Sequence, residues 1–282
     1  MLKILNGGML VGVTCDSEGK HFYDLNPGDG DETLTLKAGL MKASDCNCEC
    51  FFGYEFTDTP SGVKTPFIRQ IKKLYGSSTF FDEEISDFVT FPMTNDLADF
   101  TDSLEGVSCI VHPVSSRTGI NQDILASIER HVPALAGARK IGLVKYPCSD
   151  VKFNFDDLRR NFLSGPRTRR SLHSTERKAV KLIESINSKA GDFFISEYVR
   201  PVMLRLYMRH FLHPLDTDPD EMIEFADGRE VLVVDDVNTT GSTINEVLRV
   251  MSDKKRRPAR IVVYTLFGKG TCRFDIRNRE TT

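Results

Sequence analysis

Two adjacent carboxylates and a run of hydroxyl side chains lie together in the last third of the chain. Asp235 and Asp236 directly follow an aliphatic run. Ionised carboxylates only accept hydrogen bonds, so the pair suits two neighbouring sugar hydroxyls. The residues that come next are small and mostly carry hydroxyls: Asn238, Thr239, Thr240, Gly241, Ser242 and Thr243. Hydroxyl and backbone N–H donors suit a phosphate. A ligand with a diol at one end and a phosphate at the other is a ribose 5-phosphate.

A strand, a short loop and a helix are predicted to position these groups. The run Val231–Val234 indicates a strand covered on both faces, as in a parallel sheet. Gly241 lets the backbone approach an anion, and Ser242 or Thr243 can cap the helix. Apolar residues then recur at helical spacing: Ile244, Val247, Leu248 and Met251. Because open α/β sheets bind ligands at the carboxyl ends of their strands, the loop is a predicted binding site. The alternative is an ordinary strand–turn–helix unit whose acids occur by chance.

A second strand–loop–helix unit is predicted earlier in the chain. Val107–Val114 is a continuous buried strand pattern, and a helix pattern starts at Asn121. Arg117, in the loop between them, can donate two hydrogen bonds to one phosphate. The loop therefore indicates a second anion site, with a plain turn and a solvated arginine as the alternative. His112 falls inside the strand pattern, where a core histidine is favoured over a catalytic base.

The segment Val231–Thr243, an aliphatic strand followed by Asp-Asp-Val-x-Thr-Thr-Gly-x-Thr, resembles the phosphoribosyl pyrophosphate (PRPP) signature of type I phosphoribosyltransferases. Arg117–Gln122 also resembles a segment of the competence-protein-F-like branch, with Ile120 in place of an aromatic residue and without that branch's paired Cys-x2-Cys motifs. The resemblance implies an α/β fold with a doubly wound, mainly parallel sheet. It also implies Mg²⁺-dependent transfer of the 5-phosphoribosyl group from PRPP to a nitrogenous, nucleobase-like acceptor, with release of pyrophosphate.

The resemblance also implies roles for individual residues. Asp235, Asp236 and Arg117 would be catalytic. The PRPP-binding residues would be Asp235, Asp236, Val237, Asn238, Thr239, Thr240, Gly241, Ser242 and Thr243. Pyrophosphate would be held by Ser115, Ser116, Arg117, Thr118, Gly119 and Lys145. Phe267 would stack on the acceptor and Lys269 would donate a hydrogen bond to it. Mg²⁺ would be bound by pyrophosphate, ribose hydroxyls and water, with no direct protein ligand.

The predicted organisation has two parts. Residues 1–100 form a strand-rich segment whose position matches the hood of the family, and residues 101–282 form the transferase core. Within the core, the basic stretch 149–174 is predicted to be the flexible loop that closes over pyrophosphate, and residues 175–212 a helical insertion. Helices are expected at 175–188 and 193–211, and an acidic linker at 216–220. Since family members often pair, a homodimer is expected.

Composition excludes several other classes. The chain has 282 residues and a formal net charge of -3, which gives no overall attraction to nucleic acid or anionic membranes. No apolar run approaches the roughly 18 residues needed to span a bilayer. Seven unpatterned cysteines favour a reduced, cytoplasmic setting. Cys46, Cys48 and Cys50 are predicted to be small residues on one strand face; the alternative is a zinc site completed by Cys15 or His21.

Two other functions stay open at this point. One is a PRPP-binding regulatory or adaptor protein that has lost turnover. The other is a nucleic-acid-associated protein that uses the arginines between Arg159 and Arg170, which the overall acidity of the chain disfavours.

Overall fold

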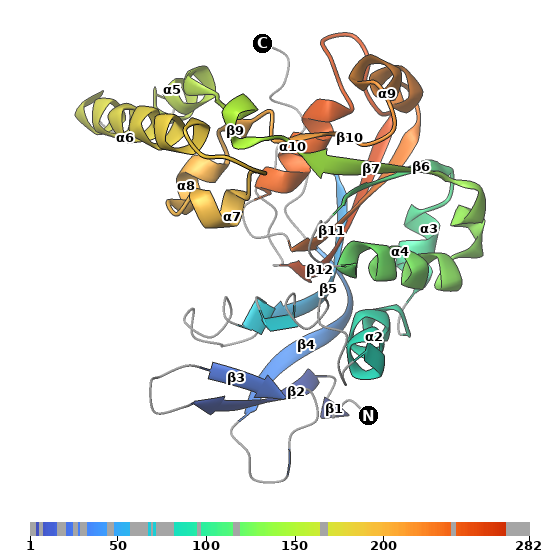
Figure 1. Cartoon of the computed structure of the whole chain (residues 1–282). Coiled ribbons are helices and arrows are strands. Elements are labelled where there is room, and N and C mark those ends of the chain that lie inside the picture. Colours follow the sequence, from blue (N-terminus) through green and yellow to red (C-terminus); the bar gives the residue numbers. More distant parts are fainter. Residues whose placement is uncertain are drawn as a thin grey trace.

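The computed structural model describes residues 4–5, 8–15, 21–24, 28, 33–43, 48–56, 67–68, 70–71, 82–94, 97–114, 119–163, 169–237 and 241–268. Within them, one large sheet runs through the molecule in the order β1-β2-β4-β5-β12-β11-β6-β7-β10, with β3 paired to β2 (Figure 1). Its strands are β1 (Ile4–Leu5), β2 (Gly8–Cys15), β3 (His21–Asp24), β4 (Thr33–Lys42), β5 (Glu49–Phe56), β6 (Val107–Pro113), β7 (Arg139–Lys145), β10 (Leu212–Pro214), β11 (Glu230–Val237) and β12 (Arg260–Gly268).

The centre of this sheet is parallel. The successive pairs β5–β12, β12–β11, β11–β6 and β6–β7 are all parallel, whereas β10 closes the far edge antiparallel to β7. The side chains of Val231–Val234 have no exposed surface, as expected for a strand covered on both faces. The strands predicted at Val107–Val114 and Val231–Val234 are therefore confirmed.

Helices cover both faces of the parallel strands. Leu232 and Val234 of β11 pack in one apolar cluster with Ile124, whereas Val231 and Val233 pack in the other with Ile244. The first face is covered by α2 (Asp82–Thr90), α3 (Ala98–Ser103) and α4 (Ile120–His131). The second is covered by α9 (Pro219–Ala226) and α10 (Ser242–Val250), whereas α5 (Phe155–Leu163) and α6 (Arg169–Asn187) join the same apolar cluster farther from the sheet. The predicted fold class, α/β with a doubly wound, mainly parallel sheet, is confirmed.

The order of the core strands creates a switch point between β6 and β11. From β6 the chain passes through α4 and the 3₁₀ helix η2 (Pro133–Gly137) to β7, on one side. From β11 it passes through α10 to β12, on the other side and across the opposite face. The connections that follow these neighbouring strands therefore diverge. In open α/β sheets such a point leaves a crevice at the carboxyl ends of the two strands.

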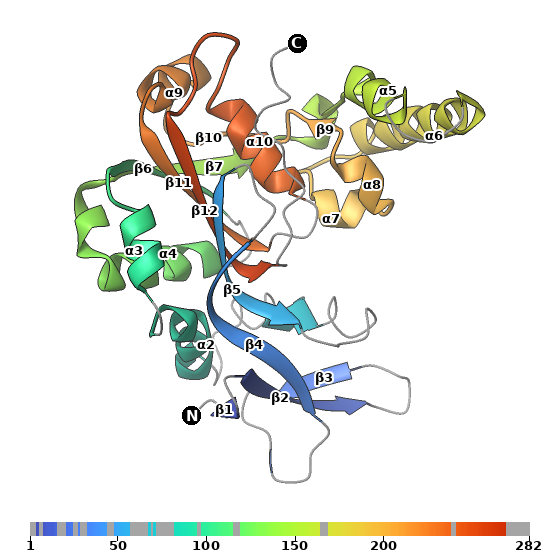
Figure 2. The same ribbon diagram turned by 180° about the vertical axis from the view of Figure 1, so that it is seen from behind.

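The N-terminal strands extend this same sheet. β1 and β2 pair antiparallel, with Leu5 opposite Gly8. β4 pairs antiparallel with β5, and β5 pairs in parallel with β12. The sequence analysis placed residues 1–100 outside the core, so this fifth parallel strand was missed. Figure 2 shows β4 and β5 running from the N-terminal strands into the central sheet.

The stretch between β7 and β11 corrects two predictions. Residues 149–174 were expected to be a loop, yet they hold η3 (Cys148–Asp150), β8 (Lys152–Phe153), α5 and the start of α6. Residues 193–211 were expected to be one helix, but they contain only α7 (Ile195–Tyr198), α8 (Val202–Arg205) and β9 (Met208–Arg209), which pairs with β8. Pro201 lies between the two short helices and is incompatible with a helix interior. Figure 1 shows α5 and α6 projecting from the sheet as a pair.

The expected linker at 216–220 contains the start of α9. The carboxylate of Asp218 accepts a hydrogen bond from the backbone N–H of Asp220 at 2.9 Å, and Pro219 occupies the first helical position. Both are standard helix-start signals, and they were present in the sequence. The remaining short helix is η1 (Phe91–Thr94), after α2. Among the described residues, no helix combines the length and apolar character needed to cross a bilayer.

Candidate functional site

The two predicted binding loops start from neighbouring strands. β6 and β11 pair in parallel through Cys109 and Val231, Ile110 and Leu232, and Val111 and Val233. Their carboxyl ends therefore lie side by side at the switch point. Ser115–Thr118 and Asn238–Thr240 fall outside the described residues, so their predicted contacts are not seen. The strand ends, and Gly119 and Gly241 at the starts of α4 and α10, define where both loops are anchored.

The acidic pair lies at the end of β11, and its two members differ in environment. Asp235 has 5% of its surface exposed, whereas Asp236 is half-buried. The backbone N–H of Asp236 donates to Oδ1 of Asp235 at 2.9 Å. Asp236 is therefore the more accessible of the two carboxylates.

Thr265 is a buried polar neighbour that the sequence analysis did not single out. It lies opposite Asp235 in the pairing of β11 with β12, and has no exposed surface. Its hydroxyl has no hydrogen-bond partner in the part of the chain that the structure describes. A threonine inside the otherwise apolar run Ile261–Phe267 was the signal in the sequence that could have identified it.

Gly241 sets the geometry where α10 begins. Its φ of 73° and ψ of 7° place it in the left-handed region, and its carbonyl accepts from the N–H of Asn245 at 2.8 Å. Gly241 is itself the N-cap, so Ser242 and Thr243 lie inside the first turn and the predicted side-chain cap is wrong. The first N–H groups of a helix have no partner within the helix.

Replacing Gly241 by alanine is expected to lower the free energy of unfolding by about 1–2 kcal/mol, because a Cβ strains the left-handed conformation. Urea titration followed by circular dichroism measures the change. Gly119→Ala is the matched control, since Gly119 is the N-cap of α4 with a φ of -80° and an added Cβ would meet Gln122 only at 3.6 Å. Equal stability of both variants would contradict the strain argument.

The loop after β6 is closed by a buried asparagine. Asn121 has 4% of its surface exposed, and its Nδ2 donates to the carbonyl of Pro113 at 2.8 Å. The bond joins the last residue of β6 to the first turn of α4 and so holds the two ends of the predicted pyrophosphate loop. Oδ1 of Asn121 has no partner among the described residues. The sequence analysis took Asn121 only as a helix start.

Two basic side chains near the site have structural neighbours. His112 is 8% exposed within β6, and burial lowers its pKa, so it is the core histidine that the sequence favoured. Lys145 is the last residue of β7, at the same carboxyl end of the parallel strands as the acidic pair. Its Nζ lies 3.8 Å from the ring centroid of Phe194, which ties it to the segment after α6. The role of Lys145 in binding pyrophosphate stays a prediction.

Phe267 does not occupy the position predicted for an acceptor-stacking residue. It is 2% exposed, and its ring lies within an aromatic cluster, with centroid distances of 5.8 Å to Tyr54, Phe56 and Phe88 and 6.0 Å to Phe67. The stacking prediction is therefore wrong for this structure: the ring packs against residues of the N-terminal segment. Lys269 lies outside the described residues.

Among the described residues, no group of three or more His, Cys, Asp or Glu side chains could hold a metal. Cys48 and Cys50 are free thiols, and burial raises the pKa of Cys48. The other candidates for a zinc site, Cys46 and the side chains of Cys15 and His21, are outside the description.

A buried carboxylate links α10 to the segment that returns from the insertion. Glu246 has no exposed surface. It accepts the N–H of Phe211 at 3.0 Å and two bonds from the guanidinium of Arg249, both at 2.9 Å. His210, which precedes Phe211, has a φ of 56°, a backbone conformation that residues other than glycine rarely adopt. Glu246 thus fixes the entry to β10 against the helix that follows the acidic pair.

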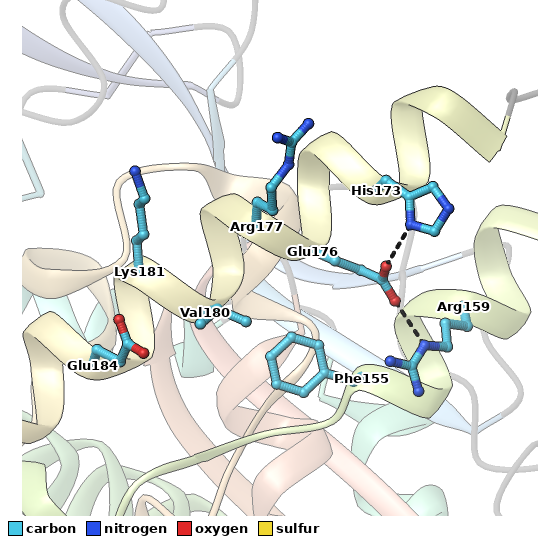
Figure 3. Close-up of a pocket in the computed structure, with 8 residues that line it drawn as sticks. All are labelled: Phe155, Arg159, His173, Glu176, Arg177, Val180, Lys181 and Glu184. Carbon is cyan, nitrogen blue, oxygen red and sulfur yellow. Dashed lines mark hydrogen bonds and ion pairs between the residues drawn. The ribbon is translucent and has the colours of Figure 1, made fainter.

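A pocket of about 690 Å³ lies elsewhere, between α5 and α6 (Figure 3). It is lined by Phe155, Arg159, His173, Glu176, Arg177, Val180, Lys181 and Glu184. None of these residues belongs to the predicted site at the ends of β6 and β11. Of them, the sequence analysis had noted only Arg159, as part of the basic stretch.

Comparison with known proteins identifies the class of the C-terminal part. Residues 201–282 match the family model described as "Phosphoribosyl transferase domain". The matched segment contains β11, the acidic pair, α10 and β12, so the resemblance to phosphoribosyltransferases is confirmed there. A search of curated proteins found no match.

One solved structure that is similar to this chain is a hypoxanthine phosphoribosyltransferase from Staphylococcus aureus. Its sequence is 11% identical to this chain, and the TM-score is 0.33. The alignment covers 69% of this chain and 71% of that one. At this level of similarity, the acceptor of that enzyme says nothing about the acceptor of this chain.

Proposed function

We propose that this chain binds PRPP with Mg²⁺ at the β6–β11 switch point and transfers its phosphoribosyl group to a nitrogenous, nucleobase-like acceptor, releasing pyrophosphate. The observation that carries the proposal is the divergence of two connections from neighbouring parallel strands, one ending in the acidic pair. The family match over residues 201–282 supports it.

The ligand would lie across both loops. Asp236, the more accessible carboxylate, would face the ribose hydroxyls, while Asp235 fixes the backbone at Asp236 through its hydrogen bond. The loop 238–240 and the N–H groups at the start of α10 would hold the 5-phosphate. The loop 115–119, with its ends joined by Asn121, would hold pyrophosphate. Arg117 would supply positive charge there.

The donor set fits a magnesium ion that is held mainly by its ligand. Two carboxylates stand at the end of β11, and the described residues contain no larger cluster that would bind a metal by itself. Mg²⁺ usually keeps several waters and binds through one or two carboxylates together with substrate phosphates. Bound with PRPP, it would neutralise charge on the pyrophosphate.

The reaction would be a substitution at ribose C1. The acceptor nitrogen forms a bond to C1 as the bond from C1 to the pyrophosphate oxygen breaks, and the leaving oxygen takes the electron pair. Positive charge develops on the sugar ring, as in glycoside chemistry. The half-buried carboxylate of Asp236 would stabilise that charge or accept the proton that the acceptor loses. Arg117 would stabilise the departing anion.

Pyrophosphate release from PRPP, measured across a panel of free bases in the presence of Mg²⁺, tests the proposal. We expect release with at least one base, and its loss in the Arg117→Ala variant, because that variant removes the cation beside the leaving group. The control is Arg257→Ala, an exposed arginine on the connection after α10. Failure of PRPP to bind at all would contradict the assignment of the site.

The second candidate is a PRPP-binding regulator without turnover. The burial of Phe267 favours it, because the residue predicted to hold an acceptor is packed in the core. Saturable PRPP binding by calorimetry, combined with no pyrophosphate release for any base, would support the regulator over the transferase.

A further inference from the structure

Lys145 and Phe194 bring a cation and an aromatic ring together at the carboxyl ends of the parallel strands. β7 pairs in parallel with β6 as far as Leu143 and Pro113, and the N–H of Val114 then donates to the carbonyl of Leu143 at 2.7 Å. Lys145 is the last residue of β7, so it stands two residues beyond the point where the loop after β6 departs. It is therefore a cation beside the loop that is proposed to hold pyrophosphate.

The segment that follows α6 is bound to the chain that leaves β7. The N–H of Phe193 donates to the carbonyl of Tyr146 at 3.0 Å, and the N–H of Cys148 donates to the carbonyl of Gly191 at 2.9 Å. An isolated antiparallel bridge joins the two residues that lie between these bonds. These contacts give the end of the helical insertion a fixed place beside the carboxyl end of β7.

Two neighbouring phenylalanines of this segment have different surroundings. Phe193 is buried, and its ring packs against those of Phe211 and Tyr198 at centroid distances of 5.7 and 5.9 Å. Phe194 is half-buried, and its carbonyl accepts the N–H groups of Glu197 at 3.0 Å and Tyr198 at 2.9 Å as α7 begins. The buried ring before it and the helix start after it fix the backbone on both sides of Phe194.

The ring of Phe194 is thereby held against the ammonium group of Lys145. The distance of 3.8 Å from Nζ to the ring centroid is well within the roughly 6 Å at which an aromatic face attracts a cation. An ammonium carries three N–H donors, so contact with a ring face is compatible with donation to a phosphate oxygen. Lysine has a flexible stem that loses rotamer freedom when it binds an anion. A lysine whose position is set in advance binds at a lower entropic cost.

We propose that Phe194 is a positioning residue whose ring holds the ammonium group of Lys145 at the carboxyl end of β7, where that group binds the pyrophosphate part of PRPP. This inference rests on the proposed function, because it needs a pyrophosphate site beside the end of β6. It also gives the helical insertion a role: the insertion supplies the ring that fixes a cation of the core.

Binding of inorganic pyrophosphate to the full chain in the presence of Mg²⁺, measured by isothermal titration calorimetry, tests the proposal. Lys145→Ala is expected to weaken binding roughly tenfold or more, because it removes a charged donor. Phe194→Leu is expected to weaken binding about threefold to fivefold, which corresponds to the strength of a cation–π contact that is partly exposed to water. Phe194→Tyr keeps the ring face and is expected to recover the affinity that leucine loses.

A double variant separates positioning of the lysine from general damage to the fold. When Lys145→Ala is already present, Phe194→Leu is expected to have no further effect on pyrophosphate binding, since the ring acts only through that lysine. Phe225→Leu is the matched control. It removes a ring whose centroid lies 4.4 Å from Cζ of Arg139, the first residue of β7, at the end of the strand away from the site. It should leave pyrophosphate binding unchanged.

The wild type tests the proposed function, and the variants test the role of Phe194. A wild type that does not bind pyrophosphate would overturn both. A wild type that binds it, with unchanged affinity in Phe194→Leu or in Lys145→Ala, would overturn the positioning role alone. So would additive losses in the double variant, or a tyrosine variant as weak as the leucine variant, because the ring would then act on something other than Lys145. Circular dichroism establishes that every variant is folded.

Discussion

Replacing Asp236 by asparagine is expected to weaken PRPP binding by about 1.5–3 kcal/mol, or roughly tenfold to a hundredfold, because hydrogen bonds to charged groups contribute about that much. Asp235→Asn is expected to weaken it as well. Asparagine keeps an oxygen that can accept the N–H of Asp236, so the backbone should remain in place. Isothermal titration calorimetry with Mg²⁺ and PRPP measures both changes.

Whether PRPP binds more weakly or more tightly to the Asp236→Asn variant distinguishes a direct contact from simple charge repulsion. PRPP is a polyanion, so removal of a carboxylate that only stood nearby would tighten its binding through lower repulsion. Weaker binding therefore requires that the carboxylates make favourable contacts with the ribose hydroxyls or with the bound cation. Asp150→Asn, an exposed carboxylate after β7, is the control and should bind as the wild type does. Unchanged or tighter binding of PRPP to the Asp236→Asn variant would show that the PRPP site does not lie at the end of β11.

Replacing Glu246 by leucine is expected to lower the free energy of unfolding by about 3 kcal/mol. The change leaves the N–H of Phe211 and the guanidinium of Arg249 without their shared acceptor. Losses of about 3–5 kcal/mol are usual when one member of a buried pair is removed. The lower end is expected here because the side chain of Arg249 is 30% exposed and stays partly hydrated. Urea unfolding measures the change.

Two further variants sharpen that measurement. Glu246→Gln keeps one acceptor oxygen for Phe211 and should lose less than leucine does. Asp156→Ala removes a carboxylate that is 78% exposed and pairs with Arg159, so it should cost under about 1 kcal/mol. If the leucine variant is no less stable than Asp156→Ala, Glu246 does not hold the entry to β10 against α10.

The strand before the acidic pair was predictable because it is a continuous apolar run. Val231–Val234 has this pattern, and it is buried on both faces. The helix α6 was recognised only from residue 175, because its buried residues Leu172, Ala179 and Ile186 are seven apart and separated by charges. Its first turns carry the same arginines that indicated a basic loop.

For the site as well, features set by the local sequence were predictable, whereas contacts with distant segments were not. The position of the acidic pair at a strand end was predictable from the chain itself. The burial of Phe267 was not, because its neighbours Tyr54, Phe56 and Phe88 come from a segment far away in sequence.

The parallel pairing of β5 with β12 has a consequence for how the chain is made. The two strands are more than 200 residues apart in sequence, as in the pair Glu49 and Val262. During translation β5 leaves the ribosome long before its neighbour exists, so one of its edges stays open while the remaining core strands emerge. Unpaired edges are prone to join other chains, and contacts this distant in sequence form slowly. The interval before β12 emerges is therefore when a nascent chain of this protein is most exposed to aggregation and most in need of a chaperone.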